Sequence, residues 1–219
     1  ILFGLPPASA TLVFSPMMEA FHRRHPQIKV SVVEQGSMMN HQKILDGKLD
    51  LALLSTDMPM SSAFGYYKIA RTRICLYLAK DHPLSGAESL SLEEIRDIPL
   101  VLLSEDSFLT THTLKTCARY KIMPNIILTT NQIMIIRQFV EKNIAGTFLF
   151  HRTIPDDDGY RAVPVREFGE AYIYLVWNQY NPVSTAVKQF VKVAQTVYPF
   201  PMVDDYCNDK KDKSPISEN

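Results

Sequence analysis

Residues 1–55 have the sequence ILFGLPPASATLVFSPMMEAFHRRHPQIKVSVVEQGSMMNHQKILDGKLDLALLS, in which strand-like and helix-like patterns alternate with few residues between them. A strand-like start is followed by apolar residues at helical spacing, and His25 precedes a proline that ends this helix. Residues 28–32 alternate as in a strand, a second helix begins near Ser37, and residues 49–54 form a buried third strand. Such alternation predicts a parallel sheet with helical crossovers, whose strand ends face possible ligands.

Composition places the chain among ordinary globular proteins without strong charge. Of 219 residues, 46% are apolar and 21% charged, and 23 basic residues balance 23 acidic residues. Without a basic excess, direct binding to DNA or to an anionic membrane by this chain is not expected. The chain has no 18-residue apolar run and no signal-peptide pattern, and its three cysteines lack a CxxC spacing. These features favour a reducing, cytoplasmic location, with a mature exported protein as the alternative.

The rest of the chain continues the same alternation, which predicts two lobes and a tail. We expect an α/β fold of two Rossmann-like β/α lobes, joined by two crossover segments, with a ligand cleft between them. An extended run at residues 66–79 would be one of these segments. The first lobe would comprise residues 1–72 and 180–202, and the second residues 73–179. Residues 203–219 are polar and charged without periodicity, which predicts a disordered tail.

Two local signals indicate helices in the second half of the chain. Ser91, with Glu94 three residues later, is a capping box that predicts a short helix at residues 92–96. Pro182 is in a favourable first-turn position for a last helix that ends at Val197. Both signals depend only on residues that are close in the sequence.

Five segments along the chain together resemble a known family. They are ILFGLPPASATLVFSPMMEAFHRRHPQIKVSVVEQGS at residues 1–37, ILDGKLDLALL at 44–54, LYLAKDHPLS at 76–85, the Ala145-Gly146 strand opening, and YLVWNQYNP at 174–182. In order and spacing they resemble the effector-binding domain of LysR-type transcriptional regulators, over residues 1–197. The resemblance implies a fold similar to type 2 periplasmic binding proteins. It also implies an N-terminal winged helix-turn-helix that is absent from this chain.

Polar residues at the predicted helix starts are the candidate ligand site. A helix start exposes unpaired N–H groups and a partial positive charge, which suit a carboxylate or another small anion. Plain helix capping is the alternative, because serine and threonine are preferred there. The resemblance favours an effector-binding role, most of all for the two serines in the first two turns. The predicted effector site comprises Ser9, Ala10, Ser37, Met38, Ser104, Thr129 and Phe148, the last as an apolar wall.

The residues after Ser37 differ from the family pattern and leave the ligand open. Of Met38 and Met39, we expect one to line the cleft and the other to be in the core, since adjacent helix positions cannot both face a cleft. Asn40 and His41 are expected on the solvated face or on a dimer surface. Thr147-Phe148, where the family often has a second glycine, is a further departure. We expect that replacing Ser9 and Ser37 by alanine abolishes stabilisation by a ligand and leaves the unliganded melting point nearly unchanged.

Metal, cofactor and catalytic sites are not indicated. His22 and His25 are three residues apart on a helix, but their neighbours are arginines, so a solvated basic helix end is expected. The acidic turn at residues 156–159 lacks the spaced ligands of a calcium loop. No GxSxG, HExxH, GxxxxGK[ST] or GxGxxG motif is present. Cys75 in a strand and Cys117 in a helix are expected to be core thiols. We expect no enzyme activity, no cofactor and no metal.

The resemblance implies an effector-sensing regulatory domain that is cytoplasmic and does not contact a membrane. A small organic anion would shift the populations of lobe and subunit arrangements. Pro16–Arg24 and Ile28–Val33 of one protomer would pack antiparallel against the second lobe of its partner in a homodimer. The full-length protein would be a tetramer that contacts DNA through its missing domain. A solute-binding protein of a transport system, or less plausibly an enzyme on the same fold, remains an alternative.

Overall fold

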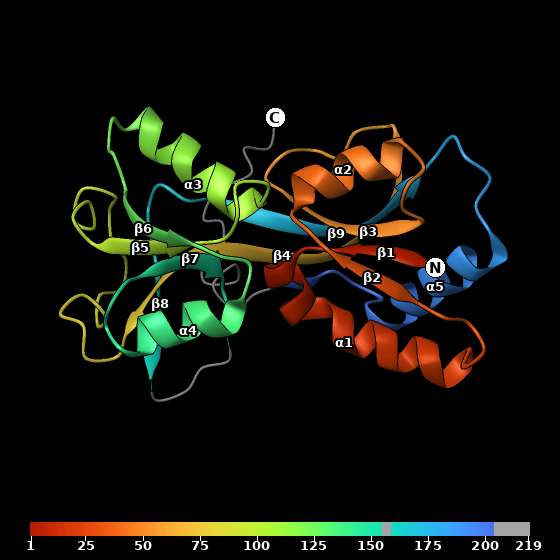
Figure 1. The fold of residues 1–219 in the computed structure, drawn as a ribbon, viewed down its shortest axis with the longest axis horizontal. Coiled ribbons are helices and arrows are strands. Elements are labelled where there is room, and N and C mark those ends of the chain that lie inside the picture. The colour runs from red at the N-terminus through yellow and green to blue at the C-terminus, as the bar shows by residue number, and fades with distance from the viewer. Residues whose placement is uncertain (155–158, 204–219) are drawn as a thin grey trace, which may run out of the picture.

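Two α/β lobes lie side by side in the computed structural model, which describes residues 1–154 and 159–203 (Figure 1). Lobe I, on the right of Figure 1, contains the N-terminal strands, and lobe II, on the left, contains the middle of the chain. The predicted two-lobed α/β fold is therefore confirmed. Most of the predicted acidic turn, most of the predicted tail, and Cys207 lie outside the described residues.

Lobe I is built on a sheet in which β1 pairs in parallel with both β2 and β3. The sheet has the order β10-β4-β9-β3-β1-β2. Its elements are β1 (Leu2–Leu5), α1 (Pro7–Arg24), β2 (Ser31–Glu34), α2 (Ser37–Leu45), β3 (Leu51–Thr56), β9 (Glu170–Asn178), α5 (Thr185–Val197), β10 (Met202–Val203) and the first part of β4 (Phe64–Ala79). The helix predicted from the opening segment is confirmed as α1.

Strand β4 belongs to both lobes. Its residues 64–73 pair antiparallel with β9, and residues 74–79 pair with β7 and β8 of lobe II. Strand β9 also pairs with β3, which joins it to the sheet of lobe I. The predicted division counted residues 170–178 with the second lobe, whereas these pairings place them beside the strands of the first. The other predicted boundaries stay predictions.

Lobe II combines antiparallel strands beside β4 with a separate parallel pair, β5 and β6. Its elements are β5 (Pro99–Leu102), α3 (Phe108–Arg119), β6 (Asn125–Thr129), α4 (Ile133–Glu141), β7 (Thr147–Phe150) and β8 (Tyr160–Pro164). A bridge between Leu100 and Gly146 connects β5 to the start of β7. An added Cβ at Gly146 would lie 3.1–3.3 Å from side-chain and backbone atoms of β4, so a larger residue would require these neighbours to move slightly.

Helices cover both faces of the two lobes. In Figure 1, α2 and α3 lie on the upper side of lobes I and II, and α1, α4 and α5 lie on the lower side. On the lower side α1 buries Val13, Met17 and Phe21 at helical spacing, and the ring of Phe21 lies 4.8 Å from that of Phe190 in α5. On the upper side, one end of α2 and one end of α3 lie near the boundary between the lobes (Figure 1). None of the helices in the described residues is long and apolar enough to cross a membrane.

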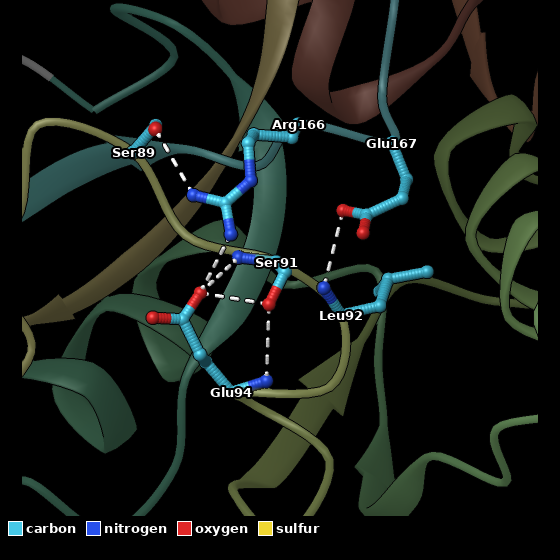
Figure 2. A network of polar contacts seen from close by, with 6 residues as sticks. All are labelled: Ser89, Ser91, Leu92, Glu94, Arg166 and Glu167. Carbon is cyan, nitrogen blue, oxygen red and sulfur yellow. Dashed lines mark hydrogen bonds and ion pairs between the residues drawn. The ribbon is translucent and has the colours of Figure 1, made fainter.

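The predicted capping box is present, but the helix at residues 92–96 is wrong: this segment is a turn. The Ser91 N–H donates to Glu94 Oε2 at 2.7 Å, and the Glu94 N–H donates to Ser91 Oγ at 3.3 Å. Figure 2 shows that Arg166, in the connection between β8 and β9, donates to Glu94, and that Glu167 accepts the Leu92 N–H. Local bonds between Ser91 and Glu94 and long-range contacts from Arg166 and Glu167 thus both hold the turn.

Two more local predictions are revised or confirmed by the packing. Helix α5 begins at Thr185 because Ser184 is its N-cap and accepts the Val187 N–H at 3.3 Å, so Pro182 precedes the helix. Cys75 and Cys117 are both buried, as expected for core residues. Burial raises the pKa of the Cys117 thiol, which disfavours the reactive thiolate.

Candidate functional site

Three buried serines meet at the C-terminal end of β3, an interior strand of the lobe I sheet. Ser9 is the third residue of α1, Ser37 is the first residue of α2, and Ser55 is near the end of β3. The hydroxyls of Ser9 and Ser55 are 2.7 Å apart, and the Ser55 N–H donates to Ser37 Oγ at 3.1 Å. The structure thus brings Ser9 and Ser37 together through Ser55, a residue that the sequence analysis did not single out.

Neither predicted serine caps its own helix. The N-cap residues are Pro6 for α1 and Gly36 for α2, and neither makes a side-chain cap bond. Pairing between β1 and β3 ends at Gly4 and Ala52. Further along β3, the backbone N–H of Ser55 donates to Ser37 Oγ. Plain capping is therefore wrong for both serines, whose hydroxyls instead join two helix starts to a strand end.

A cavity of about 720 Å³ lies between α2 of lobe I and α3 of lobe II. From lobe I it is lined by α2, the end of β3 and the connection to β4; from lobe II it is lined by one face of α3. Ser37, Met38 and Ser55 are among the lining residues, so the serine cluster reaches the cavity wall. This volume lies in the range of sites that hold small organic ligands.

The lobe I wall of the cavity is largely apolar and adaptable. Met38, Met58, Met60 and Phe64 line it. Met38 is 57% exposed, and its flexible thioether chain suits irregular ligand shapes. The prediction that one of Met38 and Met39 belongs to the core is wrong, because both are exposed. Helix α2 buries instead Ser37, Asn40 and Ile44, which share its other face.

Asn40 is fully buried, which makes its predicted surface position wrong. Its Oδ1 accepts the Gln35 Nε2–H at 2.6 Å, and its Nδ2 donates to the Leu53 carbonyl at 3.3 Å. The amide therefore ties α2 to β3 and to the segment before α2. His41 is exposed, lines the cavity and has its ring 4.8 Å from that of Phe64.

The lobe II wall carries charged and titratable groups at helical spacing. His112, Lys115 and Arg119 of α3 line the cavity, and Asp57 faces them from the connection after β3. His112 Nδ1 lies 3.4 Å from Asp57 Oδ2. Burial lowers the pKa of His112, and Asp57 only partly opposes this effect. The imidazole is therefore neutral near pH 7 in spite of its acidic neighbour.

The other predicted site residues do not line this cavity. The Ser104 hydroxyl contacts Asp106 Oδ1 at 2.5 Å and Asn131 Oδ1 at 2.7 Å. Thr129 is exposed at the end of β6, and Ala10 is half-buried in α1. Phe148 is buried and stacks on Phe168 with ring centroids 4.7 Å apart. The structure thus places Ser37 and Met38 at the cavity and these four residues elsewhere.

The functional candidates that sequence reasoning missed come mainly from α3. Lys115 and Arg119 are four residues apart, a spacing that also describes any solvated helix face. His112 precedes them by one turn and completes the same stripe. This i, i+3, i+7 pattern was a usable signal for one face of a helix. Only the fold, however, places that face opposite α2.

The relatives of this chain are transcriptional regulators. The chain is 26% identical over 145 residues to the HTH-type transcriptional regulator AlsR of Bacillus subtilis. This match covers 64% of this chain and 47% of AlsR. It spans 47% to 64% of the length of the first curated relatives that it matches.

Two solved structures have closely similar folds. The Synechocystis PCC6803 CcmR regulatory domain in complex with 2-PG has a TM-score of 0.81 at 15% identity, over 93% of this chain and 99% of that one. The effector binding domain of QuiR in complex with shikimate has a TM-score of 0.74 at 17% identity, over 91% of this chain and 96% of that one. At these identities the likeness concerns the fold, which is the two-lobed fold predicted from the sequence.

Family membership follows from the sequence itself. The model of the family described as LysR substrate binding domain matches residues 1–199, which include every helix and nearly every strand of both lobes. The resemblance stated for residues 1–197 is confirmed by this match. The chain belongs to the LysR substrate binding domain family.

Proposed function

We propose that this chain senses a small organic anion in the cavity between α2 and α3 and passes that event to a DNA-binding segment outside the chain. The observation that carries the proposal is that both lobes line one cavity. A ligand there touches lobe I and lobe II at once, so its affinity depends on how the lobes are arranged. Differential affinity of this kind is what a ligand needs to shift a conformational equilibrium.

The proposed ligand class is a carboxylate with an apolar body. Lys115 and Arg119 supply positive charge on one wall, and Met38, Met58 and Phe64 supply apolar surface on the other. Arginine and lysine hold carboxylates through charge-assisted hydrogen bonds. The shikimate bound to the structural neighbour QuiR is a carboxylate, which supports the same class here. Among the predicted residues, Ser37 and Met38 would touch the ligand, and Ser9 would act through Ser55.

In this proposal the chain binds its ligand without converting it. It does so in the cytoplasm, as part of an oligomer. The relatives are regulators of transcription, which supports sensing over catalysis. An antiparallel homodimer would bury α1 and β2 against lobe II of a partner, and a tetramer would form in the full-length protein. Val32 on β2 and Ile126 and Ile127 on β6 are exposed apolar residues that support such a contact.

A thermal-shift screen with a panel of small carboxylates tests the proposal. A ligand at about 100 times its Kd stabilises the folded state by about 2.7 kcal/mol, which raises Tm by roughly 5–10 °C for a domain of this size. The shift should shrink in Lys115→Met and persist in Lys192→Met, an exposed lysine on α5 remote from the cavity. A hit whose shift is equal in all three proteins would mean that the ligand binds elsewhere.

A further inference from the structure

The start of α2 in lobe I is bound by an acidic residue of lobe II. The Gly36 N–H donates to Asp106 Oδ2 at 2.6 Å, and the Met38 N–H donates to the Asp106 carbonyl at 3.2 Å. Asp106 belongs to the connection between β5 and α3, 70 residues away in the sequence. Two N–H groups at one end of a lobe I helix therefore find their acceptors in the other lobe.

Helix α2 has no cap of its own for these groups. Its N-cap is Gly36, no side chain of the helix makes a cap bond, and its first turn contains no acidic residue. A helix start normally takes such partners from adjacent residues, and a carboxylate there also complements the helix dipole. Asp106 supplies both the acceptor and the charge from lobe II. Separation of the lobes would leave the start of α2 uncapped.

The surroundings hold Asp106 in place for this contact. Its second carboxylate oxygen is 2.5 Å from the Ser104 hydroxyl, which also contacts Asn131 Oδ1, at the connection between β6 and α4. Gly36 makes the close approach possible, because an added Cβ would lie 2.1 Å from the Asp106 carbonyl oxygen. The backbone of Gly36, with φ of −71° and ψ of 168°, is open to any residue. Glycine is thus required by the contact and not by the turn.

We propose that Asp106, with its bonds to Gly36 and Met38, is an inter-lobe latch that keeps the two lobes closed when no effector is bound. The carboxylate takes at α2 the position that an anionic ligand takes at helix starts generally. Ser104, predicted to bind the effector, instead orients the latch. The proposal adds a conformational device to the proposed function, and its test needs no effector, so the two can fail separately.

Distances between spin labels on α2 and α3 of the ligand-free chain test the latch. Labels at Met39→Cys and Ala118→Cys, both exposed positions, report on the lobes in a Cys207→Ser background. Asp106→Ala and Gly36→Ala should each shift the distance distribution to longer values. Glu105→Ala removes an exposed carboxylate from the same connection and should leave the distribution unchanged.

A second variant keeps the test decisive if Asp106→Ala does not fold. Asp106→Asn preserves the side-chain shape and removes the charge, and it should give a smaller shift in the same direction, because a neutral acceptor binds the N–H groups more weakly. Circular dichroism establishes that each variant is folded. A folded Asp106 variant with the parent distribution, or an equal shift in Glu105→Ala, would overturn the proposal.

Discussion

The two walls of the inter-lobe cavity differ in chemistry. The lobe I wall has methionines and Phe64 around a cluster of mutually bonded serines, whereas the α3 wall of lobe II has His112, Lys115 and Arg119. The serines are more than nine-tenths buried and the two α3 cations are exposed. The first wall is thus suited to apolar contact with ligands of varied shape, and the second to recognising charge. Under the proposed function, a ligand in the cavity would contact both walls at once.

Loss of the charged wall should have the largest effect on binding. The double variant Lys115→Met with Arg119→Met removes both cations and keeps most of the aliphatic chains. Each hydrogen bond to a charged group contributes about 1.5–3 kcal/mol, so affinity for a carboxylate hit should fall roughly 100-fold or more. Calorimetric titration measures this, and urea unfolding should show ligand-free stability close to the parent. Affinity within about threefold of the parent would contradict the charge role of lobe II.

Loss of the serine cluster should act on stability, which revises the expectation from sequence. Ser9→Ala with Ser37→Ala deprives the buried Ser55 of partners for both its hydroxyl and its N–H. Unsatisfied buried groups cost about 1–3 kcal/mol, so the free energy of unfolding should fall by about that amount without ligand. Ser15→Ala, an exposed serine on α1, is the matched control for urea unfolding. An unchanged free energy of unfolding in the double variant would mean that the serine cluster does not stabilise the fold.

The fold was largely predictable because it follows local periodicity. The alternation in residues 1–55 corresponds to β1 through β3, and the apolar stripe of α1 is buried as expected. Errors arose where a local signal was overruled by distant partners. The capping box at Ser91 is formed, yet contacts from Arg166 and Glu167 hold the segment as a turn. Strand β9 was predicted with the second lobe, whereas it pairs with β3 and the first part of β4, and the residues of a strand do not reveal which strands it pairs with.

The site was predictable only in part, for the same physical reason. Ser37 and Met38 were found because helix starts have a sequence signature. Ser55 was missed because a serine at a strand end has none. The role of Asp106 depends on a neighbour 70 residues away. Asn40 was expected on the solvated face or on a dimer surface, but a buried amide is stable when its polar atoms are bonded, as they are here to Gln35 and Leu53.

The apolar wall should make a smaller contribution than the charged one. Met38→Ala removes apolar surface from the cavity, and burial of part of a methionine side chain is worth about 1 kcal/mol, so affinity should fall about fivefold. Met39→Ala is a matched control, since Met39 is also exposed on α2 but does not line the cavity. Titration of the same hit should separate the two variants. Equal losses in both would argue that α2 does not contact the ligand through Met38.

The smallest expected effect is the pH dependence that His112 introduces on the charged wall. Because its folded-state pKa lies below the ordinary value of 6.5, the unfolded chain binds more protons than the folded chain in the interval between the two values. His112 therefore lowers stability as pH falls through 6.5, and the loss is complete below its folded pKa. Urea unfolding from about pH 5 to about pH 8 measures this effect. In His112→Gln the free energy of unfolding should fall less toward acid pH than in the parent. Asp57→Asn removes the group that favours the imidazolium, so its free energy of unfolding should fall more toward acid pH than that of the parent. The same change in both variants would refute the assignment of this pH dependence to His112.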